Sequence, residues 1–254
     1  MNFKLKARIN RSEAQTMALD ELAVKVSVKN LRRRHSLDTW RAVNPEHGGK
    51  LMLYNKKVPI TESVLLVIDA QDSFKTGERW AQRNNKEFEK NVARLVDLYR
   101  EHDLPIVYFL HSDDDPGFER GGPHCKLMEF LTPRSAEPVL HKDTRNVFTS
   151  TGLPALLMEK GVRRVVITGI QMEQCCETSA RVAADLGYAV DFVTEATMTF
   201  PIPNHDKPGE ELGVDAIRER TEYALRRRFA TINTVDGIAK ELQDVKGRNI
   251  RAGK

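Results

Sequence analysis

With 254 residues, 40% of them apolar and 30% charged, the chain has the composition of a globular protein with one large domain. No apolar run approaches the roughly 20 residues that a membrane-spanning helix needs, and three cysteines are too few for a disulfide framework. The composition therefore argues against a membrane protein and a disulfide-rich secreted protein. Because the N-terminus also lacks the apolar core of a secretory signal, we expect a cytoplasmic protein.

The net charge of +4 is unevenly distributed. Residues 1–60 carry thirteen lysines and arginines against five acidic residues, a net charge of +8, so the remainder is net −4. The apolar spacing between Ser12 and Arg34 predicts a helix in this basic extension. Its final arginines would serve a nucleic-acid-binding protein, but a solvated helix end or a subunit contact is the simpler explanation, so nucleic acid is not the expected partner.

Residues 61–245 alternate apolar runs with helical patterns. Strands are predicted at residues 64–69, 105–110, 139–142, 164–168, 189–194 and 230–232, and helices at 88–99, 152–160, 174–187, 210–227 and 235–242. Such alternation is typical of βαβ units, whose strands are parallel. We predict an α/β fold, a three-layer α-β-α sandwich around a six-stranded, mainly parallel, Rossmann-like sheet, with the helical extension at its N-terminus. A long loop at 112–137 and a polar tail at 246–254 complete the chain.

Ionisable side chains follow three of the predicted strands: Asp69, Lys142 and Cys175. The carboxyl ends of parallel strands share one edge of the sheet, where ligands bind. Cys175 also falls at the start of a predicted helix, where the helix dipole favours the thiolate. A carboxylate that takes the thiol proton and an ammonium that stabilises both anions would make this cysteine a nucleophile. A buried cysteine, an aspartate cap and a surface lysine are the simpler alternatives, and spacing alone leaves both explanations open.

Three motifs resemble those of the isochorismatase-like cysteine hydrolases, the superfamily that includes nicotinamidases and N-carbamoylsarcosine amidohydrolase. Leu65–Phe74 (LLVIDAQDSF) is similar to the family's "LLVIDxQxxF" motif, and Lys142–Gly161 is similar to its "K…F…T.L…L…G" segment. Gly169–Tyr188 is similar to its "G…C…TARxAxxxGY" segment. The motifs occur in the family's order, and the resemblance covers about residues 60–245.

The resemblance implies a catalytic triad. Asp69 matches the family's general base, Lys142 its catalytic lysine and Cys175 its nucleophile. Cys175 is chosen over the adjacent Cys176 because Ser179-Ala180-Arg181 then falls where the family has Thr-Ala-Arg. Cys176 takes the place of an apolar neighbour and is expected to point into the core.

The resemblance also implies a non-proline cis peptide bond between Ile170 and Gln171, and an oxyanion hole made by the backbone N–H groups of Gln171 and Cys175. The implied enzyme is a hydrolase that acts on carbon–nitrogen bonds other than peptide bonds, in linear amides. It would form an acyl-thioester on Cys175 and use no cofactor.

The chain departs from nicotinamidases, which carry a "DxHxxxH"-like metal site after the second strand. His111, Asp113 and His124 are suitable ligands for a divalent ion, but their order differs and an acidic turn is the simpler explanation, so no metal is expected. Met172 replaces a common threonine, and Glu195 stands where the family usually has aspartate. Since both positions are expected near the pocket, we predict a substrate other than nicotinamide: another small amide, a carbamoyl compound or a ureide.

The candidates for the substrate pocket are mostly aromatic, since such pockets combine apolar walls with a few polar anchors. They are Phe74, Trp80, His111, Phe118 and Phe148. Core packing is the alternative role of each phenylalanine and of the tryptophan, and a hydrogen bond to a loop carbonyl is the alternative for His111.

Two other functions fit parts of the sequence. Vinyl-ether hydrolysis of an isochorismate-like substrate belongs to a branch of the family that often lacks the cysteine, so Cys175 argues against it. A non-catalytic partner or nucleic-acid-binding protein would act through residues 1–60. The resemblance implies a homo-oligomer, a dimer or tetramer, that binds a small-molecule substrate and no membrane.

Overall fold

The computed structural model describes residues 58–252, with side chains for residues 58–247. The predicted helix between Ser12 and Arg34, and the extension up to residue 57, lie outside the described residues. None of the helices within the described range is long and apolar enough to cross a membrane.

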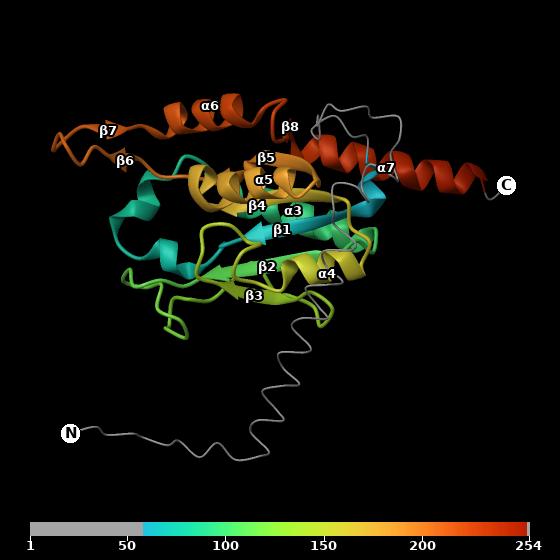
Figure 1. Cartoon of the computed structure of the whole chain (residues 1–254), viewed down its shortest axis with the longest axis horizontal. Helices are drawn as coiled ribbons and strands as arrows, with labels where there is room; N and C mark the ends of the chain where they lie inside the picture. Colours follow the sequence, from blue (N-terminus) through green and yellow to red (C-terminus); the bar gives the residue numbers. More distant parts are fainter. Residues whose placement is uncertain (1–57, 253–254) are drawn as a thin grey trace, which may run out of the picture. The chain divides into compact units, whose positions relative to one another are not determined.

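Six parallel strands form the central sheet (Figure 1). They are β1 (Ser63–Ile68), β2 (Ile106–His111), β3 (Val139–Lys142), β4 (Arg164–Ile170), β5 (Ala189–Met198) and β8 (Thr231–Asn233). Their order is β3-β2-β1-β4-β5-β8, and each neighbouring pair is parallel. The chain moves outward from β1 to β3 and then crosses over to β4. The boundary between β1 and β4 is therefore the topological switch point, the place where such sheets bind ligands.

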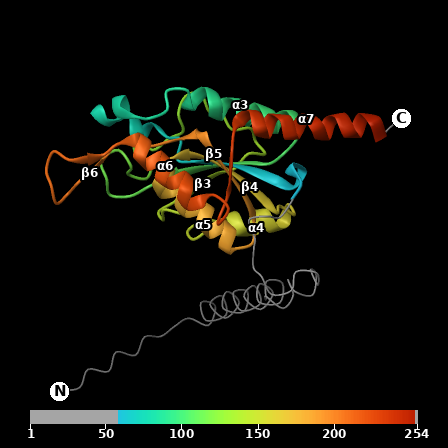
Figure 2. The same ribbon diagram turned by 90° about the horizontal axis from the view of Figure 1, so that it is seen from above.

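Helices cover both faces of the sheet (Figure 2). Helices α3 (Phe88–Glu101) and α7 (Val235–Ala252) lie on one face, and α4 (Leu153–Glu159), α5 (Glu177–Asp185) and α6 (Val214–Leu225) lie on the other. Every residue of β1 is buried. Leu65 and Val67 pack in the core cluster that includes residues of α3 and α7, and Val64, Leu66 and Ile68 pack in the cluster that includes residues of α4 and α5. Burial on both faces explains the unbroken apolar runs of the strands. The predicted three-layer α/β fold is confirmed.

Two helix boundaries differ from the prediction. The predicted helix at 210–227 begins only at Val214, because Glu211–Leu212 forms strand β7, which pairs with β6 (Ile202–Pro203) in an antiparallel hairpin. At the other end, α7 continues to Ala252, so most of the residues predicted as a polar tail are helical. Charged residues such as lysine, glutamate and arginine are good helix formers, and the loss of apolar spacing after Leu242 did not mark a helix end.

The long loop predicted at 112–137 contains no helix or strand, and Figure 1 draws it beyond the arrowhead of β2. An isolated bridge between Leu127 and Gln71 fixes it to the end of β1. Short helical turns are η2 (Ile60–Glu62), η3 (Asp72–Lys75), η4 (Glu78–Gln82) and η5 (Met172–Cys176). The loop and three of these turns therefore gather where β1, β2 and β4 end.

Candidate active site

Asp69, Lys142 and Cys175 meet at the carboxyl edge of the sheet. The Lys142 Nζ atom lies 2.8 Å from Asp69 Oδ2 and 3.5 Å from Cys175 Sγ. The side chains of Asp69 and Lys142 are fully buried, and Cys175 is 4% exposed. A buried ion pair is expensive to desolvate, so its presence beside a thiol points to a function other than stability.

The turn after β1 holds Asp69 by its backbone. Asp69 has a φ of 49°, in the left-handed region, and its N–H donates to the Phe109 carbonyl at 3.1 Å. On the neighbouring strand, Gly169 pairs with Ile68, and a Cβ atom at this glycine would lie 1.9 Å from the Ile68 oxygen. Only glycine therefore lets β4 approach β1 this closely, immediately before Asp69.

The Gln71 side chain ties this turn to the end of β2. Its Oε1 accepts from the His111 N–H at 2.7 Å, and its Nε2 donates to the His111 carbonyl at 3.0 Å and to Ser73 Oγ at 2.7 Å. Gln71 is fully buried, so water does not compete for these bonds. Sequence reasoning placed Gln71 in a family motif but gave it no role.

Lys142 is the last residue of β3, and its ammonium is surrounded by acceptors. Besides Asp69 and Cys175, Nζ contacts the Thr144 carbonyl at 3.1 Å and His111 Nδ1 at 3.3 Å. Burial by itself lowers the pKa of Lys142, but the charge of the Asp69 carboxylate and the contacts with Asp69 and Cys175 outweigh burial and raise it. Lys142 is therefore a cation at neutral pH.

The expectation that the Cys175 thiol has a lowered pKa is wrong. Burial raises the pKa of Cys175 to about 12, the Asp69 carboxylate acts in the same direction, and the Lys142 cation only partly opposes them. Cys175 also lies within the π-helical turn η5, so that α5 begins at Glu177 and not beside the thiol. The resting group is a thiol, because desolvation of the thiolate exceeds any help from a helix terminus.

Ser179 connects the cysteine to the segment after Lys142. Its Oγ donates to the Cys175 carbonyl at 2.6 Å and accepts from the Val147 N–H at 3.2 Å. Cys176 packs in the same core cluster as Cys175, beneath α4 and α5, with an exposed fraction of 0%. Of the two sulfur atoms, only that of Cys175 accepts a hydrogen bond from Lys142. The two adjacent thiols thus have different surroundings.

Gln171 lies between β4 and η5. The peptide bond between Ile170 and Gln171 is cis. The Gln171 carbonyl accepts from the N–H groups of Gln174 and Cys176, at 3.2 and 3.1 Å. The side chain is 6% exposed, and its Nε2 has no hydrogen-bond partner among the described residues. A buried amide donor without a partner is costly, and four residues before Cys175 it is available to a ligand.

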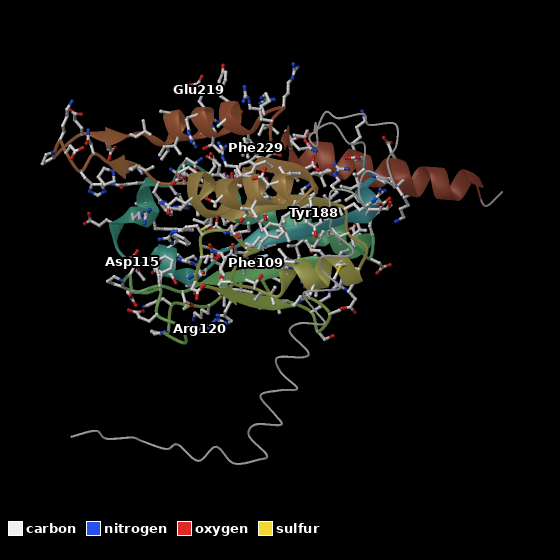
Figure 3. The ribbon with its side chains drawn as sticks, in the orientation of Figure 1. Phe109, Asp115, Arg120, Tyr188, Glu219 and Phe229 are labelled. Carbon is white, nitrogen blue, oxygen red and sulfur yellow. The ribbon has the colours of Figure 1, made fainter. Side chains whose placement is uncertain are left out.

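Four of the five predicted pocket residues lie in one cluster. The Phe74 and Phe118 rings are 5.0 Å apart, and the Phe118 and His111 rings are 6.2 Å apart. Phe200 completes the cluster through Phe74 at 5.8 Å and Trp80 at 6.5 Å. Phe200 was not predicted, although it lies two residues after the end of β5. Figure 3 labels Asp115 and Arg120, which lie on either side of Phe118 in its loop.

Phe148 belongs elsewhere. It stacks on Tyr188 at 6.0 Å and joins the core cluster beneath α4 and α5, so its core-packing alternative describes its contacts. The two residues expected near the pocket, Met172 and Glu195, have different surroundings, and Met172 shares its core cluster with Cys175. Met172 is fully buried in the same core cluster, and the Glu195 carboxylate accepts from the Val235 N–H at the start of α7.

Of the three possible metal ligands, two contact each other. His111 Nε2 lies 2.9 Å from Asp113 Oδ2, whereas His124 contributes its backbone carbonyl, which accepts from Ser73 Oγ at 3.0 Å. Within residues 58–247, no group of three or more His, Cys, Asp or Glu side chains is placed to hold a metal ion. Arg145, which no motif indicated, contacts both His111 and Asp113. Its Nη1 atom lies 2.6 Å from His111 Nε2 and 3.3 Å from Asp113 Oδ2.

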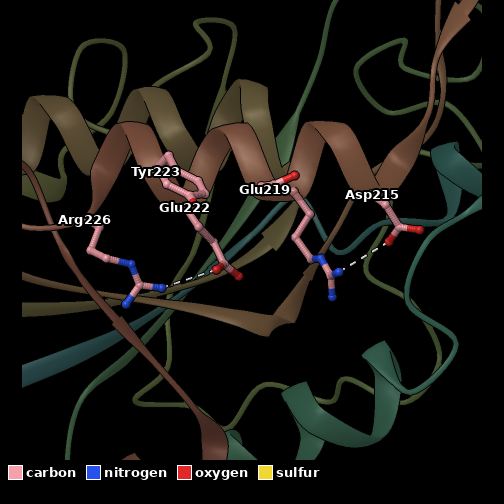
Figure 4. Close-up of a pocket in the computed structure, with 6 residues that line it drawn as sticks. Asp215, Glu219, Glu222, Tyr223 and Arg226 are labelled. Atoms are coloured by element: carbon pink, nitrogen blue, oxygen red, sulfur yellow. Dashed lines mark hydrogen bonds and ion pairs between the residues drawn. The ribbon is translucent and has the colours of Figure 1, made fainter.

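A surface hollow lies along α6, apart from these residues (Figure 4). Its walls come from one helix and the residue after it: Asp215, Arg218, Glu219, Glu222, Tyr223 and Arg226. Arg218 pairs with Asp215 and Arg226 pairs with Glu222, at 3.4 and 3.3 Å, and all four side chains reach solvent. Such exposed pairs are worth little, and none of the clustered site residues lines this hollow.

Comparison with known proteins identifies relatives along most of the described chain. The family model "Isochorismatase domain" matches residues 63–213. Nicotinamidase 3 of Arabidopsis thaliana is 28% identical over 160 residues, which cover 57% of this chain and 77% of that protein. Ureidoacrylate amidohydrolase RutB of Agrobacterium fabrum is 22% identical over 230 residues, which cover 74% and 96%. The crystal structure of an isochorismatase-family protein from Chromobacterium violaceum superposes with a TM-score of 0.67 at 25% identity, covering 75% of this chain and 96% of that one.

Proposed function

Since this chain belongs to the isochorismatase family of hydrolases, we propose that it is a cysteine-dependent amidohydrolase that cleaves a C–N bond in a small amide, carbamoyl or ureide substrate. The observation that carries the proposal is the buried contact of Lys142 with both Asp69 and Cys175. An acid-catalysed vinyl-ether hydrolase has no need of a thiol in this position. Two of the relatives are named for amide-bond hydrolysis, a nicotinamidase and a ureidoacrylate amidohydrolase.

In the proposed reaction, Asp69 takes the proton of the Cys175 thiol as the sulfur attacks the substrate carbonyl. Asp69 Oδ1 is buried and accepts no hydrogen bond from the described residues, so it is free to receive this proton. The backbone N–H groups of Gln171 and Cys175 hold the oxyanion, and Lys142 stabilises the charges of the base and the nucleophile.

Collapse of the tetrahedral intermediate breaks the C–N bond. The proton on Asp69 passes to the leaving nitrogen, which departs as ammonia or an amine, and an acyl-thioester remains on Cys175. Asp69 then takes a proton from water, the hydroxide attacks the thioester, and the acid leaves as the proton returns to the sulfur. The raised pKa of Cys175 fits this cycle, because the thiolate forms only when substrate and base are both in place.

Substrate recognition uses the aromatic cluster and the free amide of Gln171. The rings of Phe74, Phe118 and Phe200 form an apolar wall, and Gln171 Nε2 donates to an acceptor oxygen of the substrate. A carbamoyl or ureido group supplies such an oxygen. We further propose a homo-oligomer in a reducing compartment, the cytoplasm, where the three free cysteines persist.

An ammonia-release screen tests the proposal. Purified protein is incubated with small amides, carbamoyl compounds and ureides, and intact mass is measured after exposure to each hit. We expect one class to release ammonia and to leave an acyl adduct on the peptide that contains Cys175. Turnover of a vinyl ether without any adduct, or turnover that persists in Cys175→Ala, contradicts the proposed mechanism.

A further inference from the structure

The His111 ring lies between the catalytic lysine and a carboxylate. Its Nδ1 is 3.3 Å from Lys142 Nζ, and its Nε2 is 2.9 Å from Asp113 Oδ2. His111 is 2% exposed and Lys142 is fully buried, so water does not replace either contact. Neither role expected for His111, substrate binding or a hydrogen bond to a loop carbonyl, describes a ring whose two nitrogens both contact protein side chains.

The chemistry of the neighbours selects one tautomer. An ammonium only donates, so Lys142 requires a lone pair on Nδ1, and a carboxylate only accepts, so Asp113 requires a hydrogen on Nε2. A neutral imidazole with its hydrogen on Nε2 satisfies both groups. Burial and the Lys142 charge lower the pKa of His111, so the ring is neutral, as this arrangement requires.

Arg145 competes with this arrangement. Its Nη1 atom lies 2.6 Å from His111 Nε2, and it could donate there only if the hydrogen moved to Nδ1. That tautomer would set two donors, Nδ1–H and the Lys142 ammonium, against each other and would turn a lone pair toward Asp113. With the hydrogen on Nε2, the contact of Arg145 with His111 opposes two donors. The Arg145 side chain is 51% exposed and can turn away from the ring toward the Asp113 carboxylate, which lies 3.3 Å away and can accept from both residues.

The backbone on either side is held in place. Gln71 binds both the N–H and the carbonyl of His111. Asp113 Oδ1 accepts from the Asp115 N–H at 3.0 Å, and the Asp113 N–H donates to the Phe118 carbonyl at 3.3 Å. The turn after β2 therefore presents a fixed carboxylate to a fixed imidazole.

We propose that His111 and Asp113 are positioning residues for Lys142: Asp113 selects the His111 tautomer whose Nδ1 accepts from the ammonium, and this bond holds Nζ in contact with Asp69 and Cys175. The inference rests on the proposed cysteine-dependent function and adds two residues to it. The three ammonium hydrogens are shared among four neighbours. Loss of the Nδ1 acceptor leaves Asp69, Cys175 and the Thr144 carbonyl and removes the contact that holds Nζ on the β2 side, so the lysine shifts away from the nucleophile.

Four variants test the pair. His111→Leu and Asp113→Ala should lower kcat by about 10- to 100-fold, the usual effect of removing an orienting partner, with KM changed by less than about threefold. His111→Asn, whose amide oxygen can replace the Nδ1 acceptor, should recover most of kcat at the same melting temperature. Arg145→Gln, the matched control, should keep at least about half of kcat, since the proposed tautomer does not need Arg145.

A second measurement needs no substrate. Iodoacetamide alkylation of Cys175, followed by peptide mass spectrometry, reports how readily the thiol gives up its proton to Asp69 as the sulfur attacks, a step in which Lys142 stabilises the developing charge. The rates in His111→Leu and Asp113→Ala should fall toward the rate of Lys142→Met. If no amide is hydrolysed, the proposed function fails while alkylation still tests the pair. A wild-type rate in Asp113→Ala, or equal losses in Asp113→Ala and Arg145→Gln, overturns the proposal. Asp113 is partly exposed, so this variant carries the test even if His111→Leu does not fold.

Discussion

Two buried ion networks lie at opposite ends of the same sheet, and they differ in how completely their members are paired. At the amino end of β4, Arg164 binds Asp191 at 2.5 Å, Glu241 at 2.7 and 2.8 Å, and the Val58 carbonyl at 3.2 Å. At the carboxyl edge, Lys142 pairs with Asp69, whose Oδ1 has no hydrogen-bond partner among the described residues.

The difference in pairing indicates that the Arg164 network serves the fold and the Asp69–Lys142 pair serves a reaction. Arg164 joins β4, β5 and α7, and its guanidinium has a protein acceptor on each of its three nitrogens. Around Asp69 and Lys142, in contrast, the Asp69 Oδ1 atom and the Gln171 Nε2 atom have no hydrogen-bond partner among the described residues, so a ligand can bind them. Buried polar groups whose hydrogen bonds are all made within the protein stabilise the fold, whereas buried polar groups without a partner can bind a ligand.

The largest expected effect is the loss of the nucleophile. Cys175→Ala should lower kcat on the order of 10³-fold or more, because the proposed covalent intermediate forms on the Cys175 sulfur. Cys176→Ala should keep kcat within a few-fold and cost about 1–2 kcal/mol of unfolding free energy, since it only leaves a small cavity. Steady-state kinetics and urea unfolding measure the two quantities. Equal losses of kcat in both variants would move the nucleophile or give Cys176 a structural role in the site.

Stability distinguishes the two networks next. Arg164→Met leaves Asp191 buried without a counter-charge, and we expect a loss of about 3–5 kcal/mol with kcat within twofold of the wild type. The double variant Asp69→Asn, Lys142→Met removes both charges and should be about as stable as the wild type, yet inactive. Urea unfolding measures the free energy of unfolding of each variant. A double variant as unstable as Arg164→Met would show that the Asp69–Lys142 pair also stabilises the fold.

The Gln171 side chain offers a smaller test of the unsatisfied network. Gln171→Ala should raise KM about tenfold, which is about 1.4 kcal/mol of binding, while the backbone N–H of residue 171 stays in place. Because the variant removes a buried donor without a partner, its melting temperature should not fall. A lower melting temperature with unchanged KM would show that the amide serves the fold.

The smallest effect concerns pH. Burial raises the pKa of Cys176 well above its ordinary value of 9.0. Above that pH the unfolded thiol loses its proton and the native thiol keeps it, so the unfolded state binds fewer protons and the free energy of unfolding falls. The slope is up to about 1.4 kcal/mol per pH unit for one group. Urea unfolding between about pH 9 and pH 10.5 should show a shallower decline in Cys176→Ala, and an unchanged slope contradicts the assignment.

Sequence patterns predicted most of the fold, because strands buried on both faces leave unbroken apolar runs such as residues 64–68. They also indicated which three ionisable residues meet, since parallel strands bring their carboxyl ends to one edge. They did not predict the hairpin of β6 and β7, whose strands are two residues long and carry no alternating pattern.

The electrostatics of the site were harder to predict. The position of Cys175 near a helix start suggested a lowered pKa, but the depth of burial, which depends on residues distant in sequence, decides the direction. The contacts of His111 with Lys142 and Arg145 likewise join residues more than 30 positions apart. No local pattern marks such pairs.

The close approach at Gly169 has a consequence for how this protein can change over time. Asp69 and Cys175 follow the two strands, β1 and β4, whose backbones meet at Ile68 and Gly169, a contact that involves no side chain at residue 169. Substitutions in the core or in the surrounding loops can therefore accumulate, and new specificities can arise from them, while the reacting groups keep their spacing. Residue 169 must therefore stay a glycine, while the residues around the site can change.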